Sequence, residues 1–342
     1  MAKLYEPGLA IKDENSLALH RNENLFIEKE WFEYLTKEAS LKANIRFYPD
    51  PNYITLREEL AKLHNVDLEN IYVGNGADGV LADVLGYLKN VYNEMTILDI
   101  GFPVYAILAE RLKYSIKKIN RTETDKIDVN ELVVFDSPNS ITGEVFSSKI
   151  FQTILNKKGS FLIWDNTYGE FADDKITSFF DNLIYVKSFS KYFGLAGLRL
   201  GYCIASKDLI KKLALYKDVY NVNSMVEVMA LEVLKYRNKF EFYKNQMLNC
   251  KKRLEKILLN LGFILSQSKG NFVFIKHSKF SAKWLENKFF EKNILIRRFS
   301  NPLIENYVRI AIPPENKFNY FVDSLEQIIS SKSDEMVKSY MK

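Results

Sequence analysis

One stretch of the chain places a lysine, several hydroxyl side chains and an arginine close together. The segment SFSKYFGLAGLRLGY runs from Ser188 to Tyr202, with Lys191 after a hydroxyl-rich turn and Arg199 eight residues later. An amine near phosphate-binding hydroxyls and a guanidinium could bind a phosphorylated aldehyde covalently as a Schiff base. A surface lysine at the end of a strand is the alternative interpretation of the same residues.

A second candidate is Asp165, which ends the very apolar run FLIWD. Burying a carboxylate is costly unless it is paired, so this position predicts a cationic partner such as a protonated pyridine nitrogen. Tyr168, three residues later, could donate a hydrogen bond to the same ring. The alternative is an aspartate that caps the following helix.

A Gly-rich turn, GNGADG at 74–79, lies between a predicted strand and a predicted helix. Backbone N–H groups at a helix N-terminus bind phosphate without needing a basic side chain. The turn fits neither GxxxxGK[ST] nor GxGxxG, which disfavours a Walker or a dinucleotide site. An ordinary tight turn is the alternative.

The composition disfavours several other kinds of chemistry. The chain contains only three histidines, and they are far apart in sequence, which argues against a histidine-built metal site or a Ser-His-Asp triad. The two cysteines have no CxxC spacing, so we expect no disulfide framework, no metal site and a cytoplasmic compartment. The 48 Lys and Arg residues exceed the 43 Asp and Glu residues by a formal charge of +5, without a block of like charges. We therefore predict no nucleic-acid partner.

These residues need elements that bring them together. Short apolar runs such as MTILDI, ELVVFDSP, SFLIWDN and LIYVKSFS alternate with helical patterns, which predicts an α/β fold around a largely parallel sheet. In such sheets, function gathers at the carboxyl ends of the strands. The pattern is helical almost throughout from Lys207 to about Leu261, and a second, smaller α/β unit follows. No run of 18 apolar residues and no signal-peptide pattern occurs, so we expect no membrane partner.

The ordered motifs resemble those of fold-type I pyridoxal-phosphate-dependent aminotransferases. The motifs that carry this resemblance are GNGAD, FPVY, SPNSITG, WDNTY and SFSK followed by Arg199. Four further motifs narrow the likeness to the histidinol-phosphate aminotransferase subgroup: HRNEN, RFYPDP, ILIRR and YVRIAIPPEN. The resemblance spans about residues 15–325. It implies a large pyridoxal-phosphate-binding domain at 35–240 with a mostly parallel seven-stranded sheet. It also implies that an N-terminal arm (1–34) joins 241–342 in a small α/β domain.

The resemblance also implies roles for individual residues. Lys191 would carry pyridoxal phosphate as a Schiff base and then act as general base, Asp165 would pair with the pyridine nitrogen, and Tyr168 would bond the phenolic oxygen. The other implied cofactor contacts are Tyr105 and Asn139 at the ring, and Ala77, Asp78, Ser188, Ser190 and Arg199 at the phosphate. Tyr48 would reach the phosphate in the neighbouring subunit, which implies a homodimer with shared active sites.

At the substrate end, the resemblance assigns the amino donor's carboxylate to Arg309 and the substrate phosphate to Arg297. Arg21 and Asn22 lie near the expected substrate mouth, and Arg21 adds a positive charge where the subgroup has a small polar residue. Ser140 stands where the family has an asparagine that contacts the ring's phenolic oxygen, and Asn139 is the neighbour that could replace this contact. No metal ligand set is implied.

Three functions remain open from the sequence. The first is an aminotransferase that uses glutamate and 2-oxoglutarate with a small phosphorylated ketone or amine. Histidinol phosphate is one such substrate, and a three-carbon amino-alcohol phosphate formed from dihydroxyacetone phosphate is another. The second is a pyridoxal-phosphate-dependent decarboxylase of O-phosphoserine or O-phosphothreonine, in which Arg21 would hold the carboxylate. The third is a non-catalytic ligand-binding module that keeps the fold.

Overall fold

The larger part of the molecule is built on a seven-stranded sheet. The structure is a computed structural model that describes residues 16–173 and 180–340, without the side chains of 332–340. The strand order is β2-β8-β7-β6-β5-β3-β4. Within this sheet β8 runs antiparallel to both of its neighbours, and the remaining pairs are parallel. The strands are β2 (Ile71–Asn75), β3 (Glu94–Leu98), β4 (Ser115–Ile119), β5 (Leu132–Asp136), β6 (Phe161–Asp165), β7 (Leu183–Ser188) and β8 (Leu200–Ile204).

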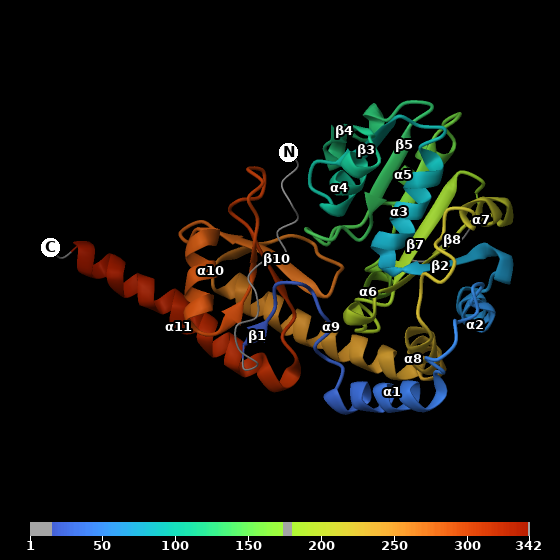
Figure 1. The fold of residues 1–342 in the computed structure, drawn as a ribbon. Helices are drawn as coiled ribbons and strands as arrows, with labels where there is room; N and C mark the ends of the chain where they lie inside the picture. Colours follow the sequence, from blue (N-terminus) through green and yellow to red (C-terminus); the bar gives the residue numbers. More distant parts are fainter. Residues whose placement is uncertain (1–15, 174–179, 341–342) are drawn as a thin grey trace.

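Helices cover both faces of this sheet, which explains the nearly continuous apolar strands in the sequence. Alternate residues of β5 belong to two different hydrophobic clusters, with Leu132 and Val134 in one and Val133 and Phe135 in the other. The first cluster includes α3 (Gly76–Leu88), α4 (Val104–Arg111) and α7 (Lys207–Leu213), and the second includes α5 (Ser148–Leu155). Because β5, β6 and β7 pair in parallel, their carboxyl ends lie at one edge of this doubly covered layer (Figure 1).

A smaller unit contains a four-stranded antiparallel sheet in the order β12-β13-β10-β9. Its strands are β9 (Phe263–Leu265), β10 (Phe272–His277), β12 (Arg297–Arg298) and β13 (Val308–Ala311), and its helices include α9 (Arg237–Asn260), α10 (Ala282–Glu291) and α11 (Glu315–Tyr340). The N-terminal arm joins this unit because β1 (Leu17–Ala18) pairs with β11 (Ile294–Leu295) in parallel. The predicted α/β fold with a large, mostly parallel sheet and a smaller α/β unit is confirmed. The domain boundaries at 35 and 240 stay a prediction.

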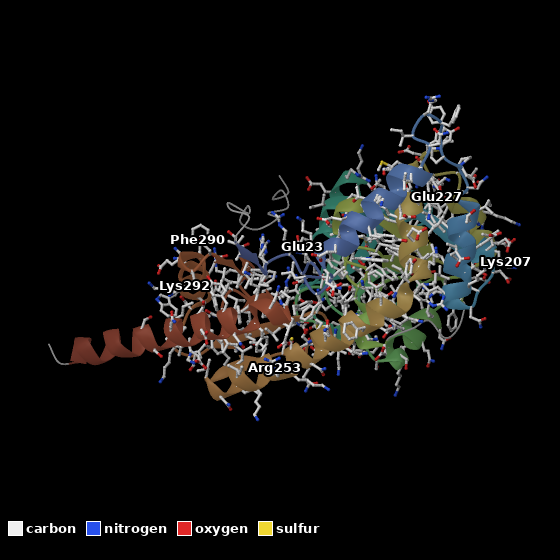
Figure 2. All side chains as sticks on the ribbon, turned by 90° about the horizontal axis from the view of Figure 1, so that it is seen from below. Glu23, Lys207, Glu227, Arg253, Phe290 and Lys292 are labelled. Carbon is white, nitrogen blue, oxygen red and sulfur yellow. The ribbon has the colours of Figure 1, made fainter. Side chains whose placement is uncertain are left out.

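The remaining α-helices are α1 (Lys29–Lys42), α2 (Ile54–His64), α6 (Gly169–Ala172) and α8 (Ser224–Lys235). Helix α8 packs against α1 and α2, and α2 also packs against β2 at the edge of the large sheet. The predicted helical run from Lys207 is wrong between α7 and α8, because the chain leaves the helix after Leu213 and starts again only where the Asn223 side chain caps α8. Figure 2 shows Glu23, on the arm, between the part that carries Lys207 and Glu227 and the part that carries Phe290. No helix in 16–173 and 180–340 is long and apolar enough to cross a membrane.

Candidate active site

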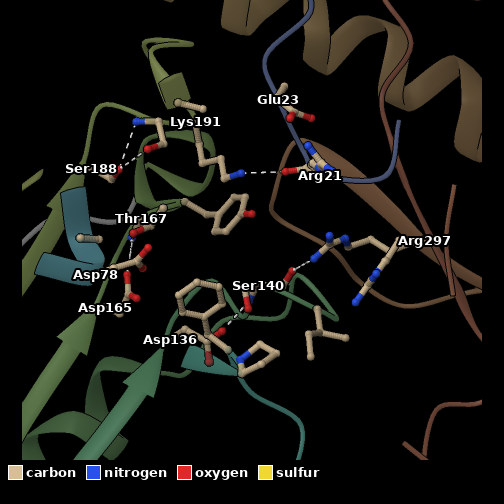
Figure 3. A pocket seen from close by; sticks show the side chains of 18 of the residues that line it. Arg21, Glu23, Asp78, Asp136, Ser140, Asp165, Thr167, Ser188, Lys191 and Arg297 are labelled. Atoms are coloured by element: carbon tan, nitrogen blue, oxygen red, sulfur yellow. Dashed lines mark hydrogen bonds between the residues drawn. The ribbon is translucent and has the colours of Figure 1, made fainter. Parts of the chain in front are cut away.

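A cavity of about 300 Å³ opens at the carboxyl ends of β5, β6 and β7, where the arm and the smaller unit meet the large sheet. Most of the residues singled out from the sequence line it. They are Arg21, Ala77, Asp78, Asp165, Tyr168, Ser188, Ser190, Lys191, Arg199, Arg297 and Arg309. Figure 3 shows Asp78, Asp165 and Ser188 on one side of the cavity and Arg21 and Arg297 on the other. The candidate site therefore has two chemically different ends.

The first end can hold a phosphate at the start of α3. The residue before this helix, Asn75, makes no side-chain capping bond, so the first backbone N–H groups of α3 remain available to an anion. Gly201 on β8 lets the helix start approach the sheet closely, since a Cβ at this position would lie 2.4 Å from the Ala77 nitrogen. Arg199 reaches the same place and pairs with Asp78, with 2.9 Å between Nη2 and Oδ2. Backbone donors and a guanidinium thus converge at one point.

Two buried serines on the turn after β7 complete this end. The Ser188 hydroxyl donates to the Ser190 hydroxyl at 2.9 Å and accepts from the Ser190 backbone N–H at 3.1 Å. Both side chains line the cavity. Hydroxyl donors beside a guanidinium suit a phosphate group, because hydrogen bonds to an ionised acceptor are stronger than neutral ones.

Asp165 provides a buried carboxylate at the end of β6. One oxygen accepts from the Thr167 backbone N–H at 3.1 Å and from the Thr167 hydroxyl at 2.7 Å, and the other accepts from the Tyr105 hydroxyl at 2.8 Å. Burial raises the pKa of Asp165 above its ordinary value, and the bonds from Thr167 and Tyr105 oppose this effect. All of these donors are neutral, so a cationic ring nitrogen would supply the charge partner that the burial of Asp165 calls for.

Lys191 and Tyr168 lie next to each other above this carboxylate. The Lys191 amine is 5.9 Å from the centre of the Tyr168 ring and donates to the backbone carbonyl of Arg21 at 2.8 Å. Burial raises the pKa of the Tyr168 hydroxyl, which therefore stays protonated and can donate a hydrogen bond. These groups fit the four polar parts of pyridoxal phosphate. The Lys191 amine suits its aldehyde, the Tyr168 phenol its phenolic oxygen, the Asp165 carboxylate its ring nitrogen, and the start of α3 with its neighbouring donors its phosphate.

The second end of the cavity carries three guanidinium groups. Arg309 donates to the Ser140 carbonyl at 2.5 Å and to the His20 carbonyl at 3.0 Å, so it joins the arm to the loop after β5. Arg297 lies 5.7 Å from the centre of the Phe299 ring, and Arg21 enters from the arm. Guanidinium groups at the open end provide forked donors for carboxylate or phosphate groups of a substrate.

Two of the predicted site residues lie behind the cavity wall. Tyr105 is buried, and its hydroxyl is bonded to Asp165, whereas Phe102 and Pro103 of the same motif line the cavity. Asn22 is fully buried, has a φ of 56°, and donates to the Tyr168 hydroxyl at 3.0 Å. Both residues thus support Asp165 and Tyr168 from outside the cavity, and their direct contacts with cofactor or substrate stay predictions.

Asn139 and Tyr48 also lie outside the lining. The Asn139 amide donates to the Ile100 carbonyl and to Asp136, and its oxygen accepts from two backbone N–H groups of its own loop. Asn139 therefore has no polar atom left to replace the ring contact of the family's asparagine. Tyr48 is 80% exposed and does not line this subunit's own cavity. Its ring stacks on the Tyr220 ring, with 4.4 Å between the two ring centres.

The structure adds residues that the sequence interpretation left out. Asp136 ends β5, lies opposite Asp165 in the sheet register and lines the cavity. Its signal is present in the sequence, because LVVFD ends in an acid as FLIWD does. Glu23 also lines the cavity and has one buried carboxylate oxygen without a hydrogen-bond partner in the described part of the chain. Thr167 was missed because its contact with Asp165 depends on the turn that follows β6.

Fold and site together define a pyridoxal-phosphate-dependent enzyme of fold type I. The sequence model of the family described as "Aminotransferase class I and II" matches residues 15–325, so the chain belongs to this family and is a pyridoxal-phosphate-dependent aminotransferase. Within the family it is similar to histidinol-phosphate aminotransferases. The histidinol-phosphate aminotransferase of Brachyspira hyodysenteriae is 32% identical over 344 residues, which cover 96% of each chain.

Solved structures share the fold. The histidinol-phosphate aminotransferase of Sinorhizobium meliloti, in complex with pyridoxal-5'-phosphate, superimposes with a TM-score of 0.81 at 19% identity and covers 92% of this chain and 91% of that one. The L-threonine-O-3-phosphate decarboxylase of Porphyromonas gingivalis superimposes with a TM-score of 0.77 at 23% identity and covers 92% of this chain and 99% of that one. The fold is thus shared by aminotransferases and a decarboxylase.

Proposed function

We propose that this aminotransferase moves an amino group between glutamate or 2-oxoglutarate and a small phosphorylated ketone or amine. The observation that carries the proposal is the set of three guanidinium groups, Arg21, Arg297 and Arg309, at the open end of the cavity. One fork binds a carboxylate and another binds a phosphate, so the set suits a donor with carboxylates and an acceptor with a phosphate. The name of the Brachyspira relative, a histidinol-phosphate aminotransferase, supports the phosphorylated class.

The proposed roles follow from the contacts. When bound, pyridoxal phosphate supplies a ring that withdraws electrons from the substrate carbon. Asp165 would keep a proton on the ring nitrogen, and the Tyr168 hydroxyl would donate to the phenolic oxygen. The Lys191 amine, freed by the incoming substrate amine, would move a proton at the substrate carbon, and Arg309 would hold the substrate's carboxylate.

The size of the cavity favours a compact substrate. Its volume of about 300 Å³ is at the lower end of the roughly 300–1,000 Å³ of ordinary ligand sites, and it has to hold both cofactor and substrate. A three-carbon phosphate needs less of this space than histidinol phosphate. We therefore include the three-carbon amino-alcohol phosphate as a substrate beside histidinol phosphate.

The proposal includes a homodimer with shared active sites. Several apolar side chains between α1 and α2, and between α7 and α8, are exposed, among them Phe47, Tyr48, Leu215 and Val219. Apolar groups clustered at a surface mark an interaction site. A second copy covering them would let Tyr48 reach the neighbouring subunit's phosphate end.

A cytoplasmic location is also proposed, and the buried free thiols Cys203 and Cys250 support it.

A decarboxylase of O-phosphoserine or O-phosphothreonine is the second candidate. The observation that favours it is Arg21, which brings a third guanidinium from the arm to the residues around Lys191. In this reaction the substrate's carboxylate, held by Arg21, would leave as CO₂, and a proton from Lys191 would take its place on the substrate carbon.

Two measurements separate the candidates. Glutamate added to the purified enzyme should convert bound pyridoxal phosphate to the pyridoxamine form, which is followed by absorbance, and phosphorylated ketones should reverse the change. Absence of this conversion together with CO₂ release from O-phosphoserine or O-phosphothreonine would reject the aminotransferase reaction in favour of decarboxylation.

Arg297→Gln should lower kcat/KM for the phosphorylated substrate by about 10- to 100-fold. Arg298→Gln is the matched control, because Arg298 pairs with Glu286 at 2.9 Å and does not line the cavity.

A further inference from the structure

Glu23 brings a carboxylate from the arm into the cavity, and the roles proposed above do not use it. One of its oxygens is buried and has no hydrogen-bond partner in residues 16–173 and 180–340. Nearly all buried polar atoms in folded proteins are hydrogen-bonded, and an unsatisfied one is costly, above all on a charged group. A negative charge also opposes the binding of anions to the same cavity. Glu23 therefore calls for a specific task.

Contacts on both sides of Glu23 hold this part of the arm against the turn that carries Lys191. Before it, the Arg21 carbonyl accepts from the Lys191 amine at 2.8 Å. After it, the Asn24 side-chain amide donates to the Tyr192 carbonyl at 2.9 Å. Figure 3 shows Glu23 and Arg21 on the same stretch of the arm, with the Lys191 amine directed at that stretch. The Glu23 carboxylate therefore belongs to the part of the cavity where the substrate reacts.

Asn22 explains how its two neighbours come to share the cavity. Its φ of 56° is left-handed, a conformation that asparagine adopts more readily than most residues. Its side chain is buried behind the cavity wall, where it donates to the Tyr168 hydroxyl at 3.0 Å. Arg21 and Glu23, on either side of it, both line the cavity. The arm thus presents a guanidinium and a carboxylate to the same ligand.

The two charges suit different groups of a substrate. Guanidinium groups take carboxylates and phosphates, whereas an ionised carboxylate is acceptor-only and takes an O–H or N–H donor. Glutamate has two carboxylates for the arginines and no donor other than its reacting amine. A phosphorylated ketone has two substituents on its carbonyl carbon, and only one of them carries the phosphate. The other substituent is the group left for Glu23.

We propose that Glu23 is a specificity-determining residue that accepts a hydrogen bond from the substituent of the phosphorylated substrate that carries no phosphate. The inference rests on the proposed function and narrows its substrate class to compounds in which this substituent has an O–H or N–H donor, as a hydroxymethyl group or an imidazole ring has. A methyl or a phenyl group in the same place leaves the Glu23 oxygen unpaired and is selected against.

The test compares two pairs of phosphorylated ketones that differ in this donor. Dihydroxyacetone phosphate has a hydroxyl that hydroxyacetone phosphate lacks. The second pair is 3-(imidazol-4-yl)-2-oxopropyl phosphate, which has a ring N–H, and 2-oxo-3-phenylpropyl phosphate, which has none. In at least one pair, kcat/KM of the parent enzyme should be about 10- to 100-fold higher for the ketone with the donor, as a hydrogen bond to a charged group provides. The pair that shows the preference identifies the donor.

Two variants of Glu23 separate its hydrogen bond from its charge. Glu23→Met removes both acceptor oxygens and should reduce the preference to within about twofold, whereas Glu23→Gln keeps one acceptor and should retain about three- to tenfold. Conversion of the cofactor by glutamate, which offers no such donor, should proceed as in the parent in both variants. Glu30→Gln is the control for loss of a charge, because Glu30 is exposed on α1 and does not line the cavity.

A readout without turnover uses the four alcohols obtained by reducing these ketones. They cannot react with the cofactor, and their dissociation constants, measured by calorimetry, should show the same preference in the parent and lose it in Glu23→Met. Equal kcat/KM within both pairs, or an unchanged preference in Glu23→Met, would overturn the inference. An equal loss with glutamate and with the ketones would also overturn it, because Glu23 would then act on the reacting amine. If glutamate reacts and none of the four ketones does, the proposed substrate class is rejected and the inference with it.

Discussion

Replacing Asp136 by asparagine should make the stability of the cofactor-free protein less dependent on pH. Burial raises the pKa of this carboxyl from 3.8 to about 6, and the hydrogen bond from the Ser140 backbone, which favours the ionised form, is already reflected in that value. Each pKa unit corresponds to about 1.36 kcal/mol, so the ionised group lowers the free energy of unfolding by about 3 kcal/mol above pH 7. Asparagine cannot ionise and avoids this loss, but its amide N–H faces the Asn139 or the Ser140 donor, which costs about 1–3 kcal/mol at every pH.

The pH dependence has a definite sign. A carboxyl whose pKa is raised on folding is fully compatible with the fold below about pH 4 and becomes costly as the pH rises through about 6. The stability of Asp136→Asn relative to the parent should therefore rise by about 3 kcal/mol between pH 4 and pH 8, with about half of the rise complete by pH 5.

Urea unfolding of cofactor-stripped protein, followed by circular dichroism at one protein concentration, measures these differences. Asp125→Asn is the control, since Asp125 is exposed, and its free energy of unfolding should stay within about 0.5 kcal/mol of the parent at each pH. A stability difference between Asp136→Asn and the parent that does not change between pH 4 and pH 8 would refute the reasoning.

Three further predictions concern the ion pairs, the phosphate end and the cofactor. Lys187→Met should lower the free energy of unfolding by about 3–5 kcal/mol, because Lys187 is buried and pairs with Glu170 at 2.7 Å. Lys62→Met, on the exposed face of α2, should leave the free energy of unfolding nearly unchanged, and urea unfolding measures both variants. Gly201→Ala should weaken pyridoxal phosphate binding at least about tenfold, because the added Cβ would push β8 away from the start of α3. Gly197→Ala is the control, since a Cβ at Gly197 would have no atom within 4 Å, and its affinity measured by titration should stay unchanged. Adding pyridoxal phosphate at about 100 times its dissociation constant should stabilise the cofactor-stripped protein by about 2.7 kcal/mol, which a rise in Tm measures. An unchanged Tm would contradict specific binding of the cofactor to the folded state.

Local patterns predicted the phosphate end and the central carboxylate, because each depends on a few neighbouring residues. A Gly-rich turn before a helix and an acid at the end of an apolar strand identify GNGADG and Asp165 without knowledge of the rest of the fold. Asp136 carries the same strand-end signal, and it was missed because the family resemblance assigns no role to an acid at that position.

Contacts between distant segments could not be predicted in this way. The bond from Tyr105 to Asp165 depends on how α4 packs against the sheet, so the sequence motif indicated an aromatic residue near the ring without its actual partner. The break before α8 was missed because the residues after Leu213 include neither Pro nor Gly, and a single capping residue such as Asn223 is a weak signal. The contact of Arg309 with the arm depends on the pairing of β1 with β11.

That last contact has a consequence for synthesis of the chain. Arg309 and its acceptor His20 are 289 positions apart, and the arm's strand partner belongs to the same late segment. At about 5–20 residues per second, the ribosome needs roughly 15–60 s to make the partners of an arm that has already emerged. The phosphate end, contained in residues 71–204, can assemble during that interval, whereas the substrate end has to wait. Chains that stop early would therefore retain the phosphate end without Arg309.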